Sequence, residues 1–120
     1  KDQSFDIVCQ NTVFSSILSE ELRQKVAMEM VRVLRPSGAI IWYDFLYNNP
    51  YNPNVRGVKI KEIRNFFPGF TFRKLRITLA PFVARRIPVS LISIIYPLLS
   101  SLVFTQTHCL GLLTKSLYHK

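Results

Sequence analysis

Residues 19–45, SEELRQKVAMEMVRVLRPSGAIIWYDF, determine the class of fold. Ser19 is a favourable N-cap residue, and the two acids after it lie at the positive end of a helix dipole. Apolar residues then recur at helical spacing, at Leu22, Val26, Met30, Val33 and Leu34. Pro36-Ser37-Gly38 ends this helix, so we expect it to extend to Arg35. The apolar residues 39–45 that follow predict a buried strand.

A second apolar run precedes this helix. Residues 5–10, FDIVCQ, fit a short strand buried on both faces, as in a parallel sheet. Residues 13–18 then predict a loop or a short helical turn. Strand, helix, tight turn and strand form a βαβ unit, whose two strands are parallel and whose crossover is right-handed.

The second half of the chain is less regular. Residues 47–54, with two Pro and four Asn, predict a loop, and a short helix is expected over residues 59–67. Strands are expected over residues 70–79 and 107–114. Residues 88–104 carry no charge but contain Pro97, and a membrane span needs about 20 apolar residues. We expect a buried or capping helix here; an interfacial helix flanked by Arg85 and Arg86 is the second option.

The chain is basic, with 16 basic and 7 acidic residues and a net charge of +9. This balance is compatible with nucleic acid, an anionic membrane surface or an acidic substrate. The bases are spread over several elements, which is typical of solvated faces. Aromatic residues lie beside bases only around Phe66-Phe67 and Phe70-Phe72, where their spacing indicates core packing. No nucleic-acid partner is therefore expected.

The two cysteines, Cys9 and Cys109, lie far apart in apolar runs without further ligands at metal-binding spacing. We expect two buried free thiols in a reducing compartment and no metal site. The polar first residues show no signal-peptide pattern. The expected location is the cytoplasm, with peripheral membrane contact as a second option.

Two motifs resemble the C-terminal half of class I S-adenosylmethionine-dependent methyltransferases (type 11/12-like domains). Ser4-Phe5-Asp6-Ile7-Val8 resembles the S-F-D-x-V opening of that family's fourth strand. Residues 32–38, RVLRPSG, resemble the R-V-L-K-P-G-G turn before its fifth strand, and residues 40–45 take the place of that strand. The fold implied is α/β: a partial Rossmann-like methyltransferase sheet made of the last four strands, the final one antiparallel, with flanking helices.

The chain departs from the family pattern in one respect. It contains neither the Gly-rich turn after the first strand nor the acidic residue that ends the second, which in the family hold the cofactor. The resemblance therefore implies that residues 1–120 are the C-terminal part of a single domain, whose N-terminal cofactor-motif half is missing. Alone, the chain should be inactive. Its open apolar sheet edge should favour self-association.

The resemblance also implies a cofactor, S-adenosyl-L-methionine, beside the end of the fourth strand, at Gln10, Asn11, Thr12 and Val13. Ligands bind at the carboxyl ends of parallel strands in such folds. The alternative for Gln10 and Asn11 is that they only satisfy loop backbone groups. Phe14 is expected to line the same pocket or to belong to the core.

The acceptor substrate is expected at the end of the following strand, near Tyr47, Asn48 and Asn49, although ordinary turn chemistry explains the same residues. Arg56 could bind an anionic group, or lie on the surface without a ligand. Methyl transfer depends mainly on positioning. If a base is needed, Asp44 and, more weakly, His108 are the candidates, and a histidine in this setting is more often structural.

The function implied is methyl transfer to a small-molecule or lipid-like acceptor. The alternative from the residues alone is a membrane-surface or lipid-associated protein that uses the apolar residues 88–104.

Overall fold

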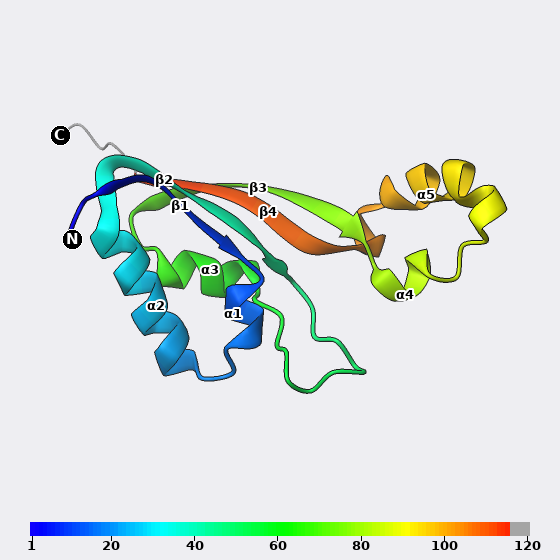
Figure 1. The fold of residues 1–120 in the computed structure, drawn as a ribbon, viewed down its shortest axis with the longest axis horizontal. Coiled ribbons are helices and arrows are strands. Elements are labelled where there is room, and N and C mark those ends of the chain that lie inside the picture. Colours follow the sequence, from blue (N-terminus) through cyan, green and yellow to red (C-terminus); the bar gives the residue numbers. More distant parts are fainter. Residues whose placement is uncertain (116–120) are drawn as a thin grey trace.

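The fold is one four-stranded sheet with helices on one face (Figure 1). A computed structural model describes residues 1–115, except for the side chains of Pro81, Phe82 and Val103. The strands are β1 (Phe5–Asn11), β2 (Leu34–Phe45), β3 (Phe70–Leu79) and β4 (Gln106–Lys115). Their spatial order is β1-β2-β4-β3, with β1 parallel to β2 and β4 antiparallel to both neighbours. The expected sheet, with its antiparallel final strand, is therefore confirmed.

Three helices cover the same face of this sheet: α1 (Val13–Ser16), α2 (Glu20–Val33) and α3 (Ile60–Phe66) (Figure 1). The core lies between them and the sheet, and its fully buried members include Phe14, Leu34, Ile40, Trp42, Ile63 and Leu113. The rings of Phe14 and Trp42 lie 4.6 Å apart, centroid to centroid. This contact between Phe14 of α1 and Trp42 of β2 fixes the position of α1 at the end of β1.

The helix start was predicted correctly, but its end was not. The Ser19 hydroxyl oxygen accepts a hydrogen bond from the Leu22 N–H at 3.2 Å, as expected for an N-cap. The helix ends at Val33 instead of Arg35, and Pro36 disfavours helical geometry at Arg35, the residue before it. Leu34 is already extended and begins β2.

The buried stripe of α2 also differs from the expected one. Leu22 is 48% exposed, whereas the buried positions are Arg23, Ala27 and Met30. Two positions are shifted by one residue, from Leu22 to Arg23 and from Val26 to Ala27, and the Arg23 side chain enters a polar network beneath the loop that follows β2. Arg23 was expected on a solvated face and is fully buried.

The second face of the sheet is open among the described residues, because α1, α2 and α3 all pack on the first face. Phe5 is 53% and Ile7 57% exposed, so β1 is not buried on both faces as expected. Cys9 lies on this open face and is exposed, whereas Cys109 is buried. The expectation of two buried thiols holds for Cys109 alone.

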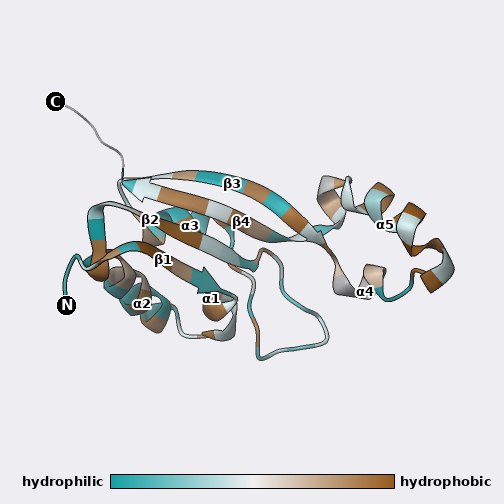
Figure 2. Ribbon diagram, turned by 45° about the horizontal axis from the view of Figure 1, so that its top comes forward, coloured by the Kyte–Doolittle hydropathy of each residue, from teal (hydrophilic) through white to brown (hydrophobic). Residues whose placement is uncertain are grey.

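A small helical module projects beyond the ends of β3 and β4 and gives the molecule its length of 54 Å (Figure 1). It contains α4 (Pro81–Ala84), η1 (Val89–Leu91), α5 (Ile92–Ser100) and η2 (Val103–Thr105). Although α5 is rich in apolar residues (Figure 2), none of its residues is buried, and Ile94 and Leu98 are 69% and 65% exposed. The expectation of a buried or capping helix was wrong, since the strands carry this segment past the edge of the core. Within the described residues, no helix has the length and apolar character to cross a membrane.

Candidate functional site

The carboxyl ends of the two parallel strands meet at one edge of the sheet. Asn11 at the end of β1 is paired with Tyr43 of β2, and the Thr12 N–H donates to the Tyr43 carbonyl at 2.8 Å. Ligands of open α/β sheets bind outside this edge. The β1–α1 turn and the loop after β2 therefore form the candidate site.

The predicted cofactor residues divide into two groups. Gln10 is buried, and both ends of its amide are used: Nε2 donates to the Tyr43 carbonyl at 3.2 Å, and Oε1 accepts from the Val13 N–H at 3.2 Å. Thr12 takes a left-handed conformation that turns the chain into α1. Asn11 is exposed and Val13 is 43% exposed, so these two side chains are accessible to a ligand.

Phe14, expected in the ligand pocket or in the core, is fully buried. Its ring packs against Trp42 at 4.6 Å and against Phe66 at 5.5 Å between centroids. It supports α1 from beneath and presents no surface to the strand ends.

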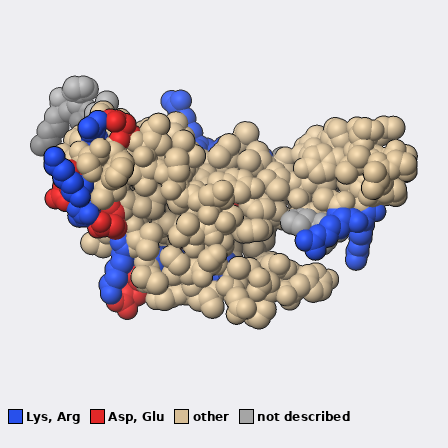
Figure 3. Space-filling model, in the orientation of Figure 1, with Lys and Arg blue, Asp and Glu red and all other residues tan. Residues whose placement is uncertain are grey.

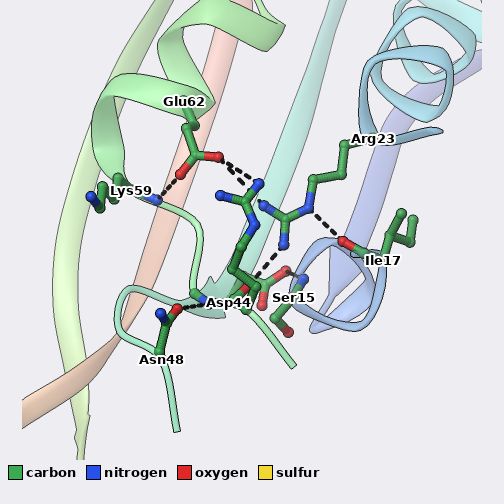
Figure 4. A network of polar contacts seen from close by, with 9 residues as sticks. Ser15, Ile17, Arg23, Asp44, Asn48, Lys59 and Glu62 are labelled. Carbon is green, nitrogen blue, oxygen red and sulfur yellow. Dashed lines mark hydrogen bonds and ion pairs between the residues drawn. The ribbon is translucent and has the colours of Figure 1, made fainter. Parts of the chain in front are cut away.

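Asp44 fastens the end of β2 to α1. The carboxylate is fully buried; Oδ2 accepts from the Ser15 N–H at 3.2 Å and Oδ1 from the Phe45 N–H at 2.8 Å (Figure 4). In the antiparallel pairing of β2 with β4, Asp44 lies opposite Cys109 and Phe45 lies opposite His108. Residues directly opposite share a face of the sheet, so the two candidate bases are on different faces.

His108 is enclosed by aromatic rings. It stacks on Tyr43 with 4.9 Å between centroids and lies 3.9 Å from the Phe45 ring. Its Nδ1 atom is 3.0 Å from the Thr107 hydroxyl oxygen. Burial lowers the pKa of His108 from its ordinary value, and the negative charge of Asp44 opposes this shift. The ring is therefore neutral near pH 7.

A buried arginine, Arg23, holds the site together (Figure 4). Its Nε donates to the Ile17 carbonyl at 2.7 Å, and Nη2 donates to the Arg56 carbonyl at 2.8 Å. Nη1 lies 3.4 Å from Glu62 Oε1 of α3. Desolvation, followed by the charge of Arg56, lowers the pKa of Arg23, and Glu62 opposes this effect. We call Arg23, Arg56 and Glu62 the arginine clamp.

The arginine clamp fixes the loop between β2 and α3. Arg56 Nη2 lies 2.9 Å from Glu62 Oε1, and the Arg56 N–H donates to the Ser15 carbonyl at 2.9 Å. The Gly57 N–H donates to Asn48 Oδ1 at 3.0 Å. A Cβ atom at Gly57 would lie 2.5 Å from the Tyr47 backbone, so only glycine allows this approach. Arg56, predicted as an anion ligand, is bound to Glu62 here.

The role of Arg23 was not predicted, although the sequence contains a signal for it. Arg23 lies four residues before Ala27 and seven before Met30, on one stripe of the helix. A basic residue on the buried stripe requires a buried partner. Glu62, one of the seven acidic residues of the chain, is that partner in the structure.

A hollow of about 640 Å³ lies beside this loop. Phe45 and residues 47–51 form one wall of this hollow. Arg85 and Arg86, which follow α4, form the other wall, and Thr107 of β4 also lines the hollow. Figure 3 shows the loop and the basic side chains beneath the projecting module on either side of this gap. The structure thus brings the predicted acceptor residues Tyr47, Asn48 and Asn49 together with two arginines.

Comparisons with known proteins agree with this architecture. Residues 1–42 match the model of a family described as a methyltransferase domain. A SAM-dependent methyltransferase from Archaeoglobus fulgidus superposes with a TM-score of 0.66 at 12% identity, over 95% of this chain and 61% of that one. The YcgJ protein from Bacillus subtilis gives 0.57 at 15% identity, over 96% and 66%. The [4+2]-cyclase SpnF gives 0.61 at 12% identity, over 95% and 50%. No curated protein matches the chain in sequence.

The resemblance to class I S-adenosylmethionine-dependent methyltransferases is thus confirmed: the chain has their fold, and its first 42 residues match their domain model. The chain spans between 50% and 66% of the length of these three structures. Identities of 12% to 15% establish a common fold only. Because one neighbour is a cyclase, the fold alone does not define the reaction.

Proposed function

We propose that this chain is the acceptor-side part of an S-adenosylmethionine-dependent methyltransferase that acts on a small-molecule or lipid-like acceptor. The observation that carries the proposal is the methyltransferase-domain match of residues 1–42, which contain β1, α1, α2 and most of β2. These elements build the sheet edge at which the candidate site lies. The cofactor supplies the methyl group when bound.

In this proposal the residues of the chain position and shield the reactants. Asn11 and Val13 are exposed at the end of β1, where they would contact the cofactor, and Gln10 holds their turn. Asp44 and the arginine clamp fix the loop that faces the acceptor. Correct alignment of reacting groups is a large part of catalysis for a displacement at a methyl group.

We also propose that the complete methyltransferase domain has an N-terminal half with a Gly-rich motif, and that this half makes the main contacts with the cofactor. Residues 1–120 lack that motif and cover only part of the related structures. We therefore propose that the chain alone has no methyltransferase activity.

Calorimetric titration with S-adenosylhomocysteine tests this function. We expect binding to a chain extended by the residues encoded upstream, and weak or no binding to residues 1–120. In the extended chain, Val13→Asp should weaken binding at least about tenfold, because the new carboxylate would lose its water when the ligand covers it. Met28→Asp, at an exposed apolar position of α2, is the matched control. An extended chain that folds and does not bind contradicts the proposal.

A further inference from the structure

We infer that the hollow between the loop after β2 and the residues after α4 binds a small molecule carrying a carboxylate or phosphate group, held by Arg85 and Arg86. The identification of this molecule as the methyl acceptor rests on the proposed function. The anion site itself does not.

The first observation is that both arginines carry uncompensated charge. Arg85 and Arg86 are exposed, and no described residue forms an ion pair with either side chain. All seven acidic residues of the chain lie between positions 2 and 62. The wall made by these two arginines therefore carries two positive charges without a nearby negative one.

The second observation is that the opposite wall offers hydrogen-bond donors. Asn48 Oδ1 accepts from the Gly57 N–H, and Asn49 Oδ1 accepts from the Tyr51 N–H at 3.0 Å. The amide NH₂ groups of both side chains have no partner among the described residues. The Tyr47 hydroxyl oxygen accepts from Arg76 Nη1 at 3.0 Å, which leaves its proton to donate.

Donors on both walls select an anion. Guanidinium groups bind carboxylate and phosphate through paired charge-assisted hydrogen bonds, and amide N–H groups are further donors for an anion. A cationic ligand would meet two like charges and find no carboxylate in the hollow. The polar part of the ligand is therefore negative.

The remaining lining defines the other part of the ligand. Phe45, Pro50 and Tyr51 supply apolar and aromatic surface. The hollow, of about 640 Å³, has the size of ordinary small-molecule sites. An aromatic or alicyclic body with one anionic group fits both walls at the carboxyl end of β2.

The test uses three probes: benzoate, phenyl phosphate and neutral benzamide. They are titrated at low salt into the chain while its amide NMR signals are recorded. We expect the two anions to bind at least about tenfold more tightly than benzamide, and to shift the signals of residues 47–51, since charged hydrogen bonds contribute this much.

Two double variants distinguish anion binding in the hollow from a general effect of the positive net charge. Arg85→Gln/Arg86→Gln should weaken anion binding at least about tenfold. Arg64→Gln/Arg73→Gln removes two exposed charges outside the hollow. In this variant the affinity for the anions should stay within about twofold of that of the unchanged chain. Equal losses in both variants, or equal binding of benzamide and the anions, would overturn the inference. Circular dichroism confirms that each variant is folded.

Vesicles containing phosphatidylglycerol distinguish the source of the anion. Binding to vesicles that depends on Arg85 and Arg86, without binding of the soluble anions, would overturn the small-molecule site in favour of a lipid headgroup. If the anions bind as expected and the extended chain never binds S-adenosylhomocysteine, the anion site stands and its role as acceptor site falls. If the extended chain binds S-adenosylhomocysteine and the anions do not bind, the proposed function stands and the anion site falls.

Discussion

Asp44 and His108 lie one residue apart in the register of β2 and β4, with their side chains on opposite faces of the sheet. Asp44 is bonded to the backbone of α1 on the covered face, whereas His108 packs between Tyr43 and Phe45 on the other. The two residues therefore do not form an acid–base pair. Each makes a separate, measurable contribution.

Replacing Asp44 by Asn should destabilise the fold. The carboxylate accepts two backbone hydrogen bonds, from Ser15 and Phe45, and an amide provides only one acceptor atom. The free energy of unfolding should fall by about 1–3 kcal/mol, the usual effect of one unsatisfied buried donor. Urea unfolding followed by the fluorescence of Trp42, the single tryptophan, measures it. An unchanged unfolding curve would show that these bonds contribute little.

His108 should make the stability depend on pH. Because burial lowers its pKa below the ordinary value of 6.5, the unfolded chain binds a proton more readily than the folded chain. The stabilising contribution of the neutral ring is fully present above about pH 6.5 and is lost as the pH falls through the folded pKa. The midpoint of unfolding should therefore decrease when the pH is lowered from about 7.5 to about 5.5. His108→Gln should reduce this slope. Equal slopes in the two chains would exclude His108 as the cause.

Replacing Arg23 by Met should destabilise the fold, because it removes the contacts that hold the loop around the site. The change leaves the Ile17 and Arg56 carbonyls and Glu62 without their buried partner. The expected loss is about 3 kcal/mol, as for other broken buried ion pairs. Arg23→Lys should recover only part of it, since an ammonium group does not reproduce the guanidinium geometry. Lys25→Met, on the exposed side of α2, should change stability by less than about 0.5 kcal/mol. If both Met variants behave alike, the arginine clamp is not stabilising.

The chain should self-associate through the β1 side of the sheet. β1 is an edge strand, and its side chains Phe5 and Ile7 are more than half exposed. Ile7→Lys should reduce association measured by light scattering over a concentration series, because a charged edge opposes strand pairing. Leu98→Lys places the same charge on α5. A greater effect of Leu98→Lys would assign the association to the projecting module, and a monomer at every concentration would contradict the prediction.

The local signals in the sequence were sufficient for the sheet. The cap at Ser19 and the apolar runs specify elements through neighbouring residues, although α2 ends two residues before the position expected from Pro36. The resemblance to a known sheet then supplied the direction of the last strand. These features could be predicted because each depends on short-range chemistry or on a common topology.

The site could be predicted only in part. The Arg23 contacts come from Ile17, Arg56 and Glu62, which no local pattern connects. Likewise, Arg85 lies across the hollow from Tyr47, and no local pattern connects two residues so far apart in the sequence. For α5 the composition indicated burial, but burial depends on the position of a segment relative to the core. Apolar content alone cannot specify that position.

The position of β4 has a consequence for biosynthesis. β4 comes last in sequence among the four described strands, yet it lies between β2 and β3 and pairs with both. During translation β3 has no partner strand until residues beyond Gln106 leave the ribosome, while β1 and β2 can pair much earlier. The nascent chain must therefore keep β3 unpaired for that interval, when it is accessible to chaperones and to other nascent chains.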